Sequence, residues 1–440
     1  MAFYIFFVLV NIVLYFSSLY LGLDRVPINI DYLICLMIAI KYRKIACFLF
    51  FLVVLADVLL LLRQVFPFFR IEDIVFILRF VFLASFYYQL FIFIFIIFLL
   101  ISVMFFYKSK IIAKKNIYFF LMVVLIFLLE SIYGALQLNQ TKKITESYFV
   151  NFVTLQFYGF SQSLRMEGQD FTHFPYTVST QALFEQKPKG HVLFILNESF
   201  GMPQDHRIVD ELLQPLYMQQ DKVSNLEVAQ SSYVMPTLYA ELRELCHMQP
   251  NNFNMKNIDS GFEHCLPHIY KKNGYQTFAL HGALGVMYDR KYWYPKVGFD
   301  KTIFYEDKSW NKRCYSFPGA CDIEMVEEVV NIFKSEGSKK FVYWLTLNSH
   351  AVYDSRDIFI DRFSCEKFNI EKSTESCRNL KLQAQFFSIL AQMIDAPFMK
   401  NITVVVVGDH SPAIFNINEK MKNFEGDNVL MLKFDINNEK

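Results

Sequence analysis

The 440-residue sequence predicts an N-terminal α-helical transmembrane domain of about five spans and a C-terminal α/β domain. Hydrophobic residues make up 54% of the chain, more than in an ordinary globular protein, and nearly all of the excess precedes residue 140. From residue 191 onward, short apolar runs alternate with helical stretches, which is typical of a sheet covered by helices. The 43 basic and 42 acidic residues nearly cancel, so we expect no nucleic-acid partner.

The first apolar segment, residues 3–22, carries no charge and approaches the roughly 20 residues that cross a bilayer. No basic region precedes it and no small-residue cleavage site follows it, so we expect an uncleaved anchor. The further predicted spans are 26–40, 45–62, 88–107 and 117–137. The span at 26–40 is the weakest because Asp31 interrupts it. Charged residues among apolar neighbours predict that 63–87 is an amphipathic surface helix.

Loop charges set the expected orientation. Two loops are rich in basic residues, one between the second and third spans and one between the fourth and fifth: Lys41, Arg43, Lys44, Lys108, Lys110, Lys114 and Lys115. Basic loops stay on the cytoplasmic side, so five spans place everything after residue 137 outside. We therefore expect a multi-pass membrane protein whose C-terminal domain lies on the side opposite the cytoplasm.

Cysteine usage supports export independently. Six cysteines follow the membrane segments: Cys246, Cys265, Cys314, Cys321, Cys365 and Cys377. An even number in an exported domain indicates disulfides, and sequential pairing closes the shortest loops. The alternative is six free thiols in a cytosolic domain. Between the two parts, 138–190 is predicted to be a connector in which the amphipathic segment 144–165 lies along the membrane.

Polar residues follow four apolar runs that we expect to be buried parallel strands. The runs are 191–197, 275–280, 341–347 and 402–407, and they precede Glu198, His281, His350 and Asp409-His410. Ligands bind at the carboxyl ends of the strands in such sheets. Carboxylate and imidazole groups gathered there would suit zinc or manganese, so a metal site is predicted.

A possible nucleophile occurs at the start of a predicted helix. Pro236 marks that start and Thr237 follows it. The positive end of the helix dipole, together with a bound cation, would lower the pKa of this hydroxyl and make an alkoxide accessible. The alternative is that Thr237 only begins the helix.

Taken in order, Glu198, Thr237, His350 and Asp409-His410 resemble the motifs of a known family. These are the membrane-anchored phosphoethanolamine and phosphoglycerol transferases of the alkaline phosphatase/sulfatase superfamily, which include the lipoteichoic acid synthases. The resemblance implies a sulfatase-like catalytic domain over 191–440, after the transmembrane domain at 1–137. It also implies a multi-pass protein of a bacterial inner membrane whose catalytic domain faces the periplasm. It also implies a divalent metal, Zn²⁺ or Mn²⁺, held by Glu198, Thr237, Asp409 and His410.

The same resemblance assigns roles to the remaining residues. Thr237 would be the nucleophile and His350 would contact the substrate phosphate. Thr237-x-x-x-Glu241 matches a pattern of the synthases, and four residues would form the head-group site: His281, Tyr288, Arg290 and Glu241. Tyr288 stands where the synthases have Trp, so the head-group pocket can differ.

The predicted reaction transfers a phosphoalcohol from a membrane phospholipid, through phosphothreonine, to a cell-envelope glycan or a lipid A-type acceptor. Phosphoethanolamine and phosphoglycerol both remain open, as do zinc and manganese, and the oligomeric state is not predicted. The alternative is a membrane-anchored phosphodiesterase of the same superfamily. A sulfatase proper needs a Cys/Ser-x-Pro-x-Arg motif, which this sequence lacks.

Overall fold

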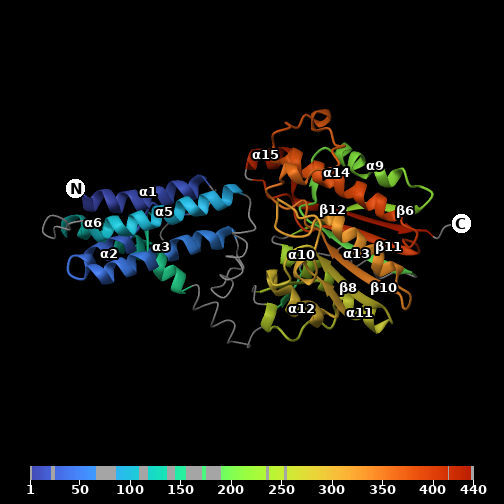
Figure 1. The fold of residues 1–440 in the computed structure, drawn as a ribbon, viewed down its shortest axis with the longest axis horizontal. Helices are drawn as coiled ribbons and strands as arrows, with labels where there is room; N and C mark the ends of the chain where they lie inside the picture. The colour runs from blue at the N-terminus through green and yellow to red at the C-terminus, as the bar shows by residue number, and fades with distance from the viewer. Residues whose placement is uncertain are drawn as a thin grey trace. The chain divides into compact units, whose positions relative to one another are not determined.

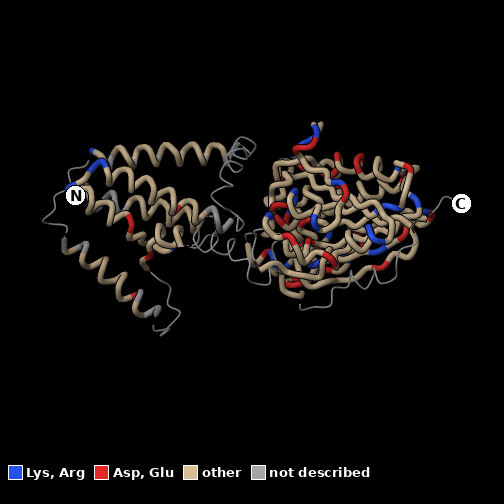
Figure 2. Tube along the Cα trace, turned by 90° about the horizontal axis from the view of Figure 1, so that it is seen from below, with Lys and Arg blue, Asp and Glu red and all other residues tan. Residues whose placement is uncertain are grey.

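The computed structural model describes residues 2–20, 25–65, 86–108, 117–135, 144–154, 171–174, 190–233, 237–251, 255–414 and 416–437. The chain divides into two compact units, Met1–Met166 and Glu167–Lys440 (Figure 1). Lys, Arg, Asp and Glu are sparse in the first unit and frequent in the second (Figure 2). The two units are described separately below.

The first unit contains helices at the predicted spans: α1 (Ala2–Tyr20), α2 (Asp31–Ala39), α3 (Arg43–Val65), α5 (Phe86–Lys108) and α6 (Ile117–Ala135). Among the described residues, one stretch, Arg43–Leu61 in α3, is both long and apolar enough to cross a membrane. The other long helices hold shorter apolar segments, namely Leu9–Leu19, Ile92–Ile101 and Leu121–Glu130. The number of spans therefore stays a prediction, and most of the predicted surface helix at 63–87 lies outside the described residues.

The predicted span at 26–40 is wrong as a continuous helix. The nine residues of α2 rise only about 13 Å, which is less than half of a bilayer core. Before α2, the short strand β1 (Ile28–Asn29) pairs in parallel with β2 (Thr145–Glu146). Asp31 accepts hydrogen bonds from Ser147 Oγ at 2.6 Å and from Phe149 N at 2.8 Å, at the start of the helical residues 148–154. Asp31, which interrupts the predicted span, thus forms two hydrogen bonds to residues of the predicted connector.

A second polar group is buried nearby in the first unit. Arg25 and Asp57 form an ion pair at 2.8 Å with both side chains fully buried. Asn29 and Tyr32 also donate to the Asp57 carboxylate. Several donors around one carboxylate compensate for the loss of its hydration.

The second unit is built on an eight-stranded sheet of order β5-β12-β11-β4-β10-β8-β9, with β6 also paired to β12. The strands are β4 (His191–Asn197), β5 (Gly201–Pro203), β6 (Val223–Ser232), β8 (Gln276–His281), β9 (Lys301–Ile303), β10 (Lys340–Leu345), β11 (Ile402–Gly408) and β12 (Phe424–Ile436). Strands β11, β4, β10, β8 and β9 run parallel, whereas β12 is antiparallel to β11. The four predicted strands are the four adjacent strands β11, β4, β10 and β8.

Helices cover both faces of this sheet because alternate strand residues point to opposite sides. Val192, Phe194 and Leu196 of β4 pack with α10 (Thr237–Cys246), α11 (Leu266–Lys272) and α12 (Arg290–Val297). Leu193 and Ile195 pack with the helices of the other face: α9 (Arg207–Tyr217), α13 (Asp322–Lys334) and α14 (Glu375–Ile394) (Figure 1). Burial on both faces explains why the four predicted strands are almost continuously apolar.

Two of the three predicted disulfides are confirmed. Cys246 bonds to Cys265, and Cys365 bonds to Cys377. Cys314 and Cys321 are buried and unbonded, with 2.6 Å between their sulfur atoms.

Candidate active site and metal centre

The topology gathers the predicted site residues at one edge of the sheet. Glu198 follows β4, Asp409 and His410 follow β11, His281 ends β8, and His350 lies five residues beyond β10. These four strands are neighbours and parallel, so their carboxyl ends meet. Gly408 permits this meeting, because a Cβ there would lie 2.2 Å from the carbonyl oxygen of Phe200. The residues after the strands therefore converge.

Glu198, Asp409 and His410 form a buried cluster whose ligand atoms all lie within 4.8 Å of one another. His410 Nε2 lies 3.2 Å from Asp409 Oδ2 and 3.6 Å from Glu198 Oε1. On its other side, His410 Nδ1 lies 2.9 Å from the carbonyl oxygen of Ser411. A carbonyl can only accept, so Nδ1 carries a proton, and Nε2 faces the two carboxylates.

This arrangement fits a divalent cation. Burial raises the pKa of Glu198 to about 8, and the nearby Asp409 carboxylate adds to the rise. The two carboxylates therefore need a proton or a bound cation to offset their repulsion. Two carboxylates and an imidazole are ligands that both zinc and manganese accept.

Thr237 joins the same cluster. It is the first residue of α10, and its hydroxyl donates to Asp409 Oδ2 at 3.0 Å. The residue is 9% exposed. The structure thus brings together the four residues predicted to hold the metal, with a hydroxyl at the positive end of a helix.

His281 and His350 lie close to this cluster as neutral imidazoles. Burial lowers the pKa of His350, and the negative charge of Asp409 partly opposes that effect. Burial likewise lowers the pKa of His281 well below its ordinary value, and Arg290 and His350 lower it further. Each ring places Nδ1 next to a backbone carbonyl, that of Leu345 for His281 and that of Ala351 for His350. Both rings therefore keep Nε2 available to a substrate oxygen.

The predicted head-group residues meet in a buried network. Glu241 is fully buried, and Arg290 donates to it from Nε at 2.9 Å and pairs with it through Nη2 at 2.8 Å. The hydroxyls of Tyr294 and Tyr343 also contact Glu241. The described contacts of Glu241 are all to protein side chains. Its role in this network is therefore to hold Arg290.

Tyr288 links this network to the metal centre. Its ring lies under Arg290, with 5.1 Å between the guanidinium carbon and the ring centroid. Burial raises the pKa of its hydroxyl, the charge of Arg290 opposes that rise, and the charges of Glu198 and Asp409 add to it. Tyr288 and Asp289 both have left-handed backbone conformations, with φ of 53° and 56°. Such residues are uncommon and often occur at functional sites.

Ser199 is a site residue that the sequence pattern does not reveal. It has a φ of 53°, donates from N to Asp409 Oδ1 at 2.8 Å and donates from Oγ to Glu198 Oε1 at 3.0 Å. One serine thereby orients both carboxylates of the cluster. The sequence marks Ser199 as a site residue only through its position directly after Glu198.

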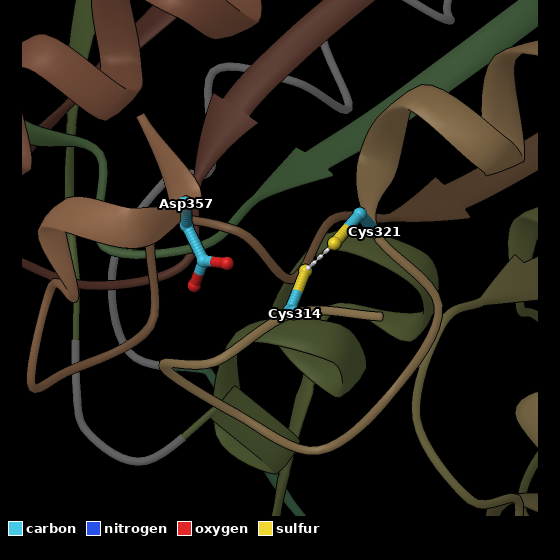
Figure 3. Close-up of side chains that lie close together, drawn as sticks. All are labelled: Cys314, Cys321 and Asp357. Atoms are coloured by element: carbon cyan, nitrogen blue, oxygen red, sulfur yellow. Dashed lines mark hydrogen bonds between the residues drawn. The ribbon is translucent and has the colours of Figure 1, made fainter. Parts of the chain in front are cut away.

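A second group of potential ligands comprises Cys314, Cys321 and Asp357 (Figure 3). Two thiolates on one tetrahedral zinc, at about 2.3 Å each, would lie about 3.8 Å apart. The observed sulfur separation is 2.6 Å, much nearer to the roughly 2.05 Å of a disulfide. The Asp357 carboxylate already accepts hydrogen bonds from Tyr315 N and Ser316 N. The geometry therefore suits a disulfide and does not suit a metal.

Several solved structures resemble the chain. The lipoteichoic acid synthase LtaP from Listeria monocytogenes matches at 17% identity and a TM-score of 0.46, over 56% of this chain and 65% of that chain. The phosphoglycerol transferase GacH of Streptococcus pyogenes, in complex with sn-glycerol-1-phosphate, matches at 18% identity and a TM-score of 0.39, over 60% of this chain and 78% of that chain. The C-terminal periplasmic domain of EcEptC from Escherichia coli matches at 13% identity and a TM-score of 0.38, over 61% and 76%.

Among curated proteins, none matches the sequence of this chain. The family model described as Sulfatase matches residues 191–430, which include the candidate ligands and the whole eight-stranded sheet except the last six residues of β12. Because that match spans more than half of the 440 residues, the chain belongs to the sulfatase family, as the motif resemblance predicts.

Proposed function

We propose that this protein transfers a phosphoalcohol, phosphoethanolamine or phosphoglycerol, from a membrane phospholipid to a hydroxyl of a cell-envelope glycan or lipid. One observation carries the proposal. The Thr237 hydroxyl donates to Asp409 Oδ2 at 3.0 Å, and the same oxygen lies 3.2 Å from His410 Nε2. A hydroxyl built into the candidate ligand cluster is placed to act as a nucleophile.

Glu198, Thr237, Asp409 and His410 would hold the divalent metal. When bound, the metal would polarise a phosphoryl oxygen and lower the pKa of the Thr237 hydroxyl. The chain itself supplies the start of α10, whose dipole favours negative charge on the Thr237 oxygen. The Thr237 oxygen, which would carry negative charge as the nucleophile, thus lies where the helix dipole stabilises that charge.

The reaction balances over two displacements at phosphorus. First, the Thr237 oxygen bonds to phosphorus, the bond to the diacylglycerol oxygen breaks, and the Thr237 proton ends on diacylglycerol. Second, an acceptor hydroxyl oxygen bonds to phosphorus, the bond to Thr237 breaks, and the acceptor proton returns to Thr237. His350, whose Nδ1–H is bonded to Ala351 O, can accept and return protons through Nε2. Two in-line displacements retain the configuration at phosphorus.

The head-group site would be formed by His281, Tyr288 and Arg290, with Glu241 positioning Arg290. A planar guanidinium can bind phosphate oxygens, and the Tyr288 ring offers a flat apolar surface to the alcohol. Tyr288 Oη also gives this surface a polar end.

The test is mass spectrometry of the Thr237 peptide from the full chain, incubated with phosphatidylethanolamine or phosphatidylglycerol and Zn²⁺ or Mn²⁺. We expect an adduct on Thr237 whose mass identifies the transferred group, and no adduct in Thr237→Ala. Release of free head group to water by Thr237→Ala at the wild-type rate would overturn the proposal. Turnover of an aryl sulfate with neither lipid consumed would also overturn it, because the family includes sulfatases by its description.

A further inference from the structure

We propose that Gln383 on α14 is a positioning residue of the metal centre, because its side-chain amide fixes the backbone that carries Glu198. The inference rests on the metal centre within the proposed function and is independent of the group transferred. Gln383 is 1% exposed and lies on α14, and its contact with Glu198 is to the main-chain carbonyl oxygen. In the loop that carries Glu198, its amide bonds to two backbone carbonyl oxygens and to one side chain, that of Asn197.

The loop that presents Glu198 has an unfavourable backbone conformation. β4 ends at Asn197, and Ser199, directly after the ligand, has a φ of 53°. A residue with a side chain avoids this region unless its surroundings impose it. The orientation of the Glu198 carboxylate therefore depends on the groups that hold residues 197–199.

Gln383 holds all three of these residues. Its Nε2 donates to the carbonyl oxygen of Glu198 at 2.9 Å and to that of Ser199 at 3.1 Å. Its Oε1 accepts from Asn197 Nδ2 at 2.8 Å. One planar amide thus bonds on both sides of the left-handed residue and determines the direction in which the chain leaves the strand.

Other buried side chains complete the arrangement. Thr346 Oγ1 accepts from Glu198 N and donates to Asn197 Oδ1, each at 2.9 Å. Ser349 Oγ donates to Glu198 O at 2.6 Å, and Asn379 Nδ2 donates to Ser199 O at 3.1 Å. All of these side chains are at most 4% exposed, so water cannot readily replace a lost partner.

The helix that carries Gln383 is itself firmly held. α14 has 20 residues, and Thr374 caps it by accepting from the backbone N of Cys377. Cys377 is bonded to Cys365, which fixes the first turn of the helix. Asn379 and Gln383 are four residues apart and so lie on one face. Second-layer groups on rigid elements keep metal ligands in a productive geometry, and their loss typically weakens metal affinity by about 10–100-fold.

The chain offers a matched control two residues away. Gln385 is also 1% exposed, and its amide also makes three bonds, accepting from Phe359 N and Ile360 N and donating to Asp357 O. It therefore resembles Gln383 in burial and bonding but serves a different loop. Gln383→Met and Gln385→Met each replace an amide by an apolar side chain of similar length.

The experiment measures Zn²⁺ and Mn²⁺ affinity of the full-length metal-free variants in detergent, by competition with a chromophoric chelator. Urea unfolding of the same samples reports stability separately. We expect Gln383→Met to weaken metal affinity about 10–100-fold and Gln385→Met to weaken it less than about 3-fold, with similar losses of stability. Equal metal affinity in the two variants would overturn the proposal.

Asn379→Leu serves if Gln383→Met does not fold. This change removes one bond to Ser199 O and leaves Gln383 in place. A folded Asn379→Leu protein with weakened metal affinity supports the proposal, and one with wild-type affinity for both metals overturns it. If metal affinity falls as expected while no lipid is consumed by the wild type, the positioning role stands and the proposed function fails.

Discussion

Arg290 and Glu241 form an ion pair of 2.8 Å in which the two side chains are 3% and 0% exposed. Nε and Nη2 of Arg290 are both directed to Glu241, and Nη1 contacts Met287 O at 3.5 Å. These contacts hold the guanidinium in one orientation, unlike a flexible surface cation. This relationship connects the start of α12 to α10, the helix that begins with the proposed nucleophile.

Removing the acidic partner of this pair should be costly. Glu241→Gln leaves a buried guanidinium without its counter-charge, and such changes lose about 3–5 kcal/mol of the free energy of unfolding. We expect that loss in urea denaturation, together with a higher KM for the lipid donor. Tyr294→Phe removes one hydroxyl donor to Glu241 and is the milder control, at about 1 kcal/mol. An unchanged stability of Glu241→Gln would contradict the role assigned to the pair.

Thr237 variants separate chemistry from folding. Thr237→Ala loses one hydroxyl bond to Asp409, so the free energy of unfolding should change by only about 1 kcal/mol. Transfer from labelled phospholipid should nevertheless fall by several orders of magnitude, because no oxygen remains to carry the phosphoryl group. Thr237→Ser keeps that oxygen and should retain measurable transfer. Full activity of the alanine variant, measured alongside circular dichroism, would rule out the nucleophile.

Cys314 and Cys321 should be bonded in protein isolated from an oxidising compartment. A disulfide across this short loop would stabilise the fold by about 2–3 kcal/mol. Non-reducing peptide mapping should find both cysteines in one linked peptide, and Cys314→Ser with Cys321→Ser should lower the free energy of unfolding by that amount. Both thiols reacting with a blocking reagent before reduction would show that the pair is unbonded.

Asp322 should make stability depend on pH. Burial raises the pKa of its carboxyl to about 7, although the backbone N–H groups of Asn348 and Leu347 oppose the rise. The unfolded chain ionises Asp322 at its ordinary pKa, so the native state loses stability as pH rises from about 4 to about 7 and then levels off. Over this range, Asp322→Asn should lose less of its free energy of unfolding than the wild type, by several kcal/mol. Parallel curves for the two proteins would contradict this assignment.

The candidate site was largely predictable because its ligands follow buried strands. The continuous apolar runs of β4, β8, β10 and β11 are strong signals in the sequence. Five of the predicted site residues end one of these strands or follow it within five residues: Glu198, His281, His350, Asp409 and His410. β12 and β6 were not predicted. Most residues of β6 are exposed or partly exposed, and charged residues interrupt β12. Neither strand therefore has a strong apolar pattern in the sequence.

The parts that escaped prediction depend on contacts between distant residues. Gln383 lies 185 residues from Glu198 along the chain, and no local pattern marks a glutamine as a partner of a strand end. The error at 26–40 has the same cause. The Asp31 carboxylate bonds to Ser147 and Phe149, more than 100 residues later in the chain. Hydropathy alone cannot reveal such partners. Apolar patterns locate elements, whereas tertiary hydrogen bonds are specified by single residues.

The helix α10 carries three separate connections within seven residues. Thr237 begins it, Glu241 holds Arg290, and Arg243 donates from Nη2 to Gly408 O at 3.0 Å and from Nη1 to Asp409 O at 3.3 Å. Because one rigid rod ties these groups together, a shift that adapts it to a new head group would also disturb the strand end that carries Asp409. If the proposed function holds, we therefore expect differences in head-group preference to arise in the short turn Met287–Asp289, which lies outside the helix that begins with the proposed nucleophile.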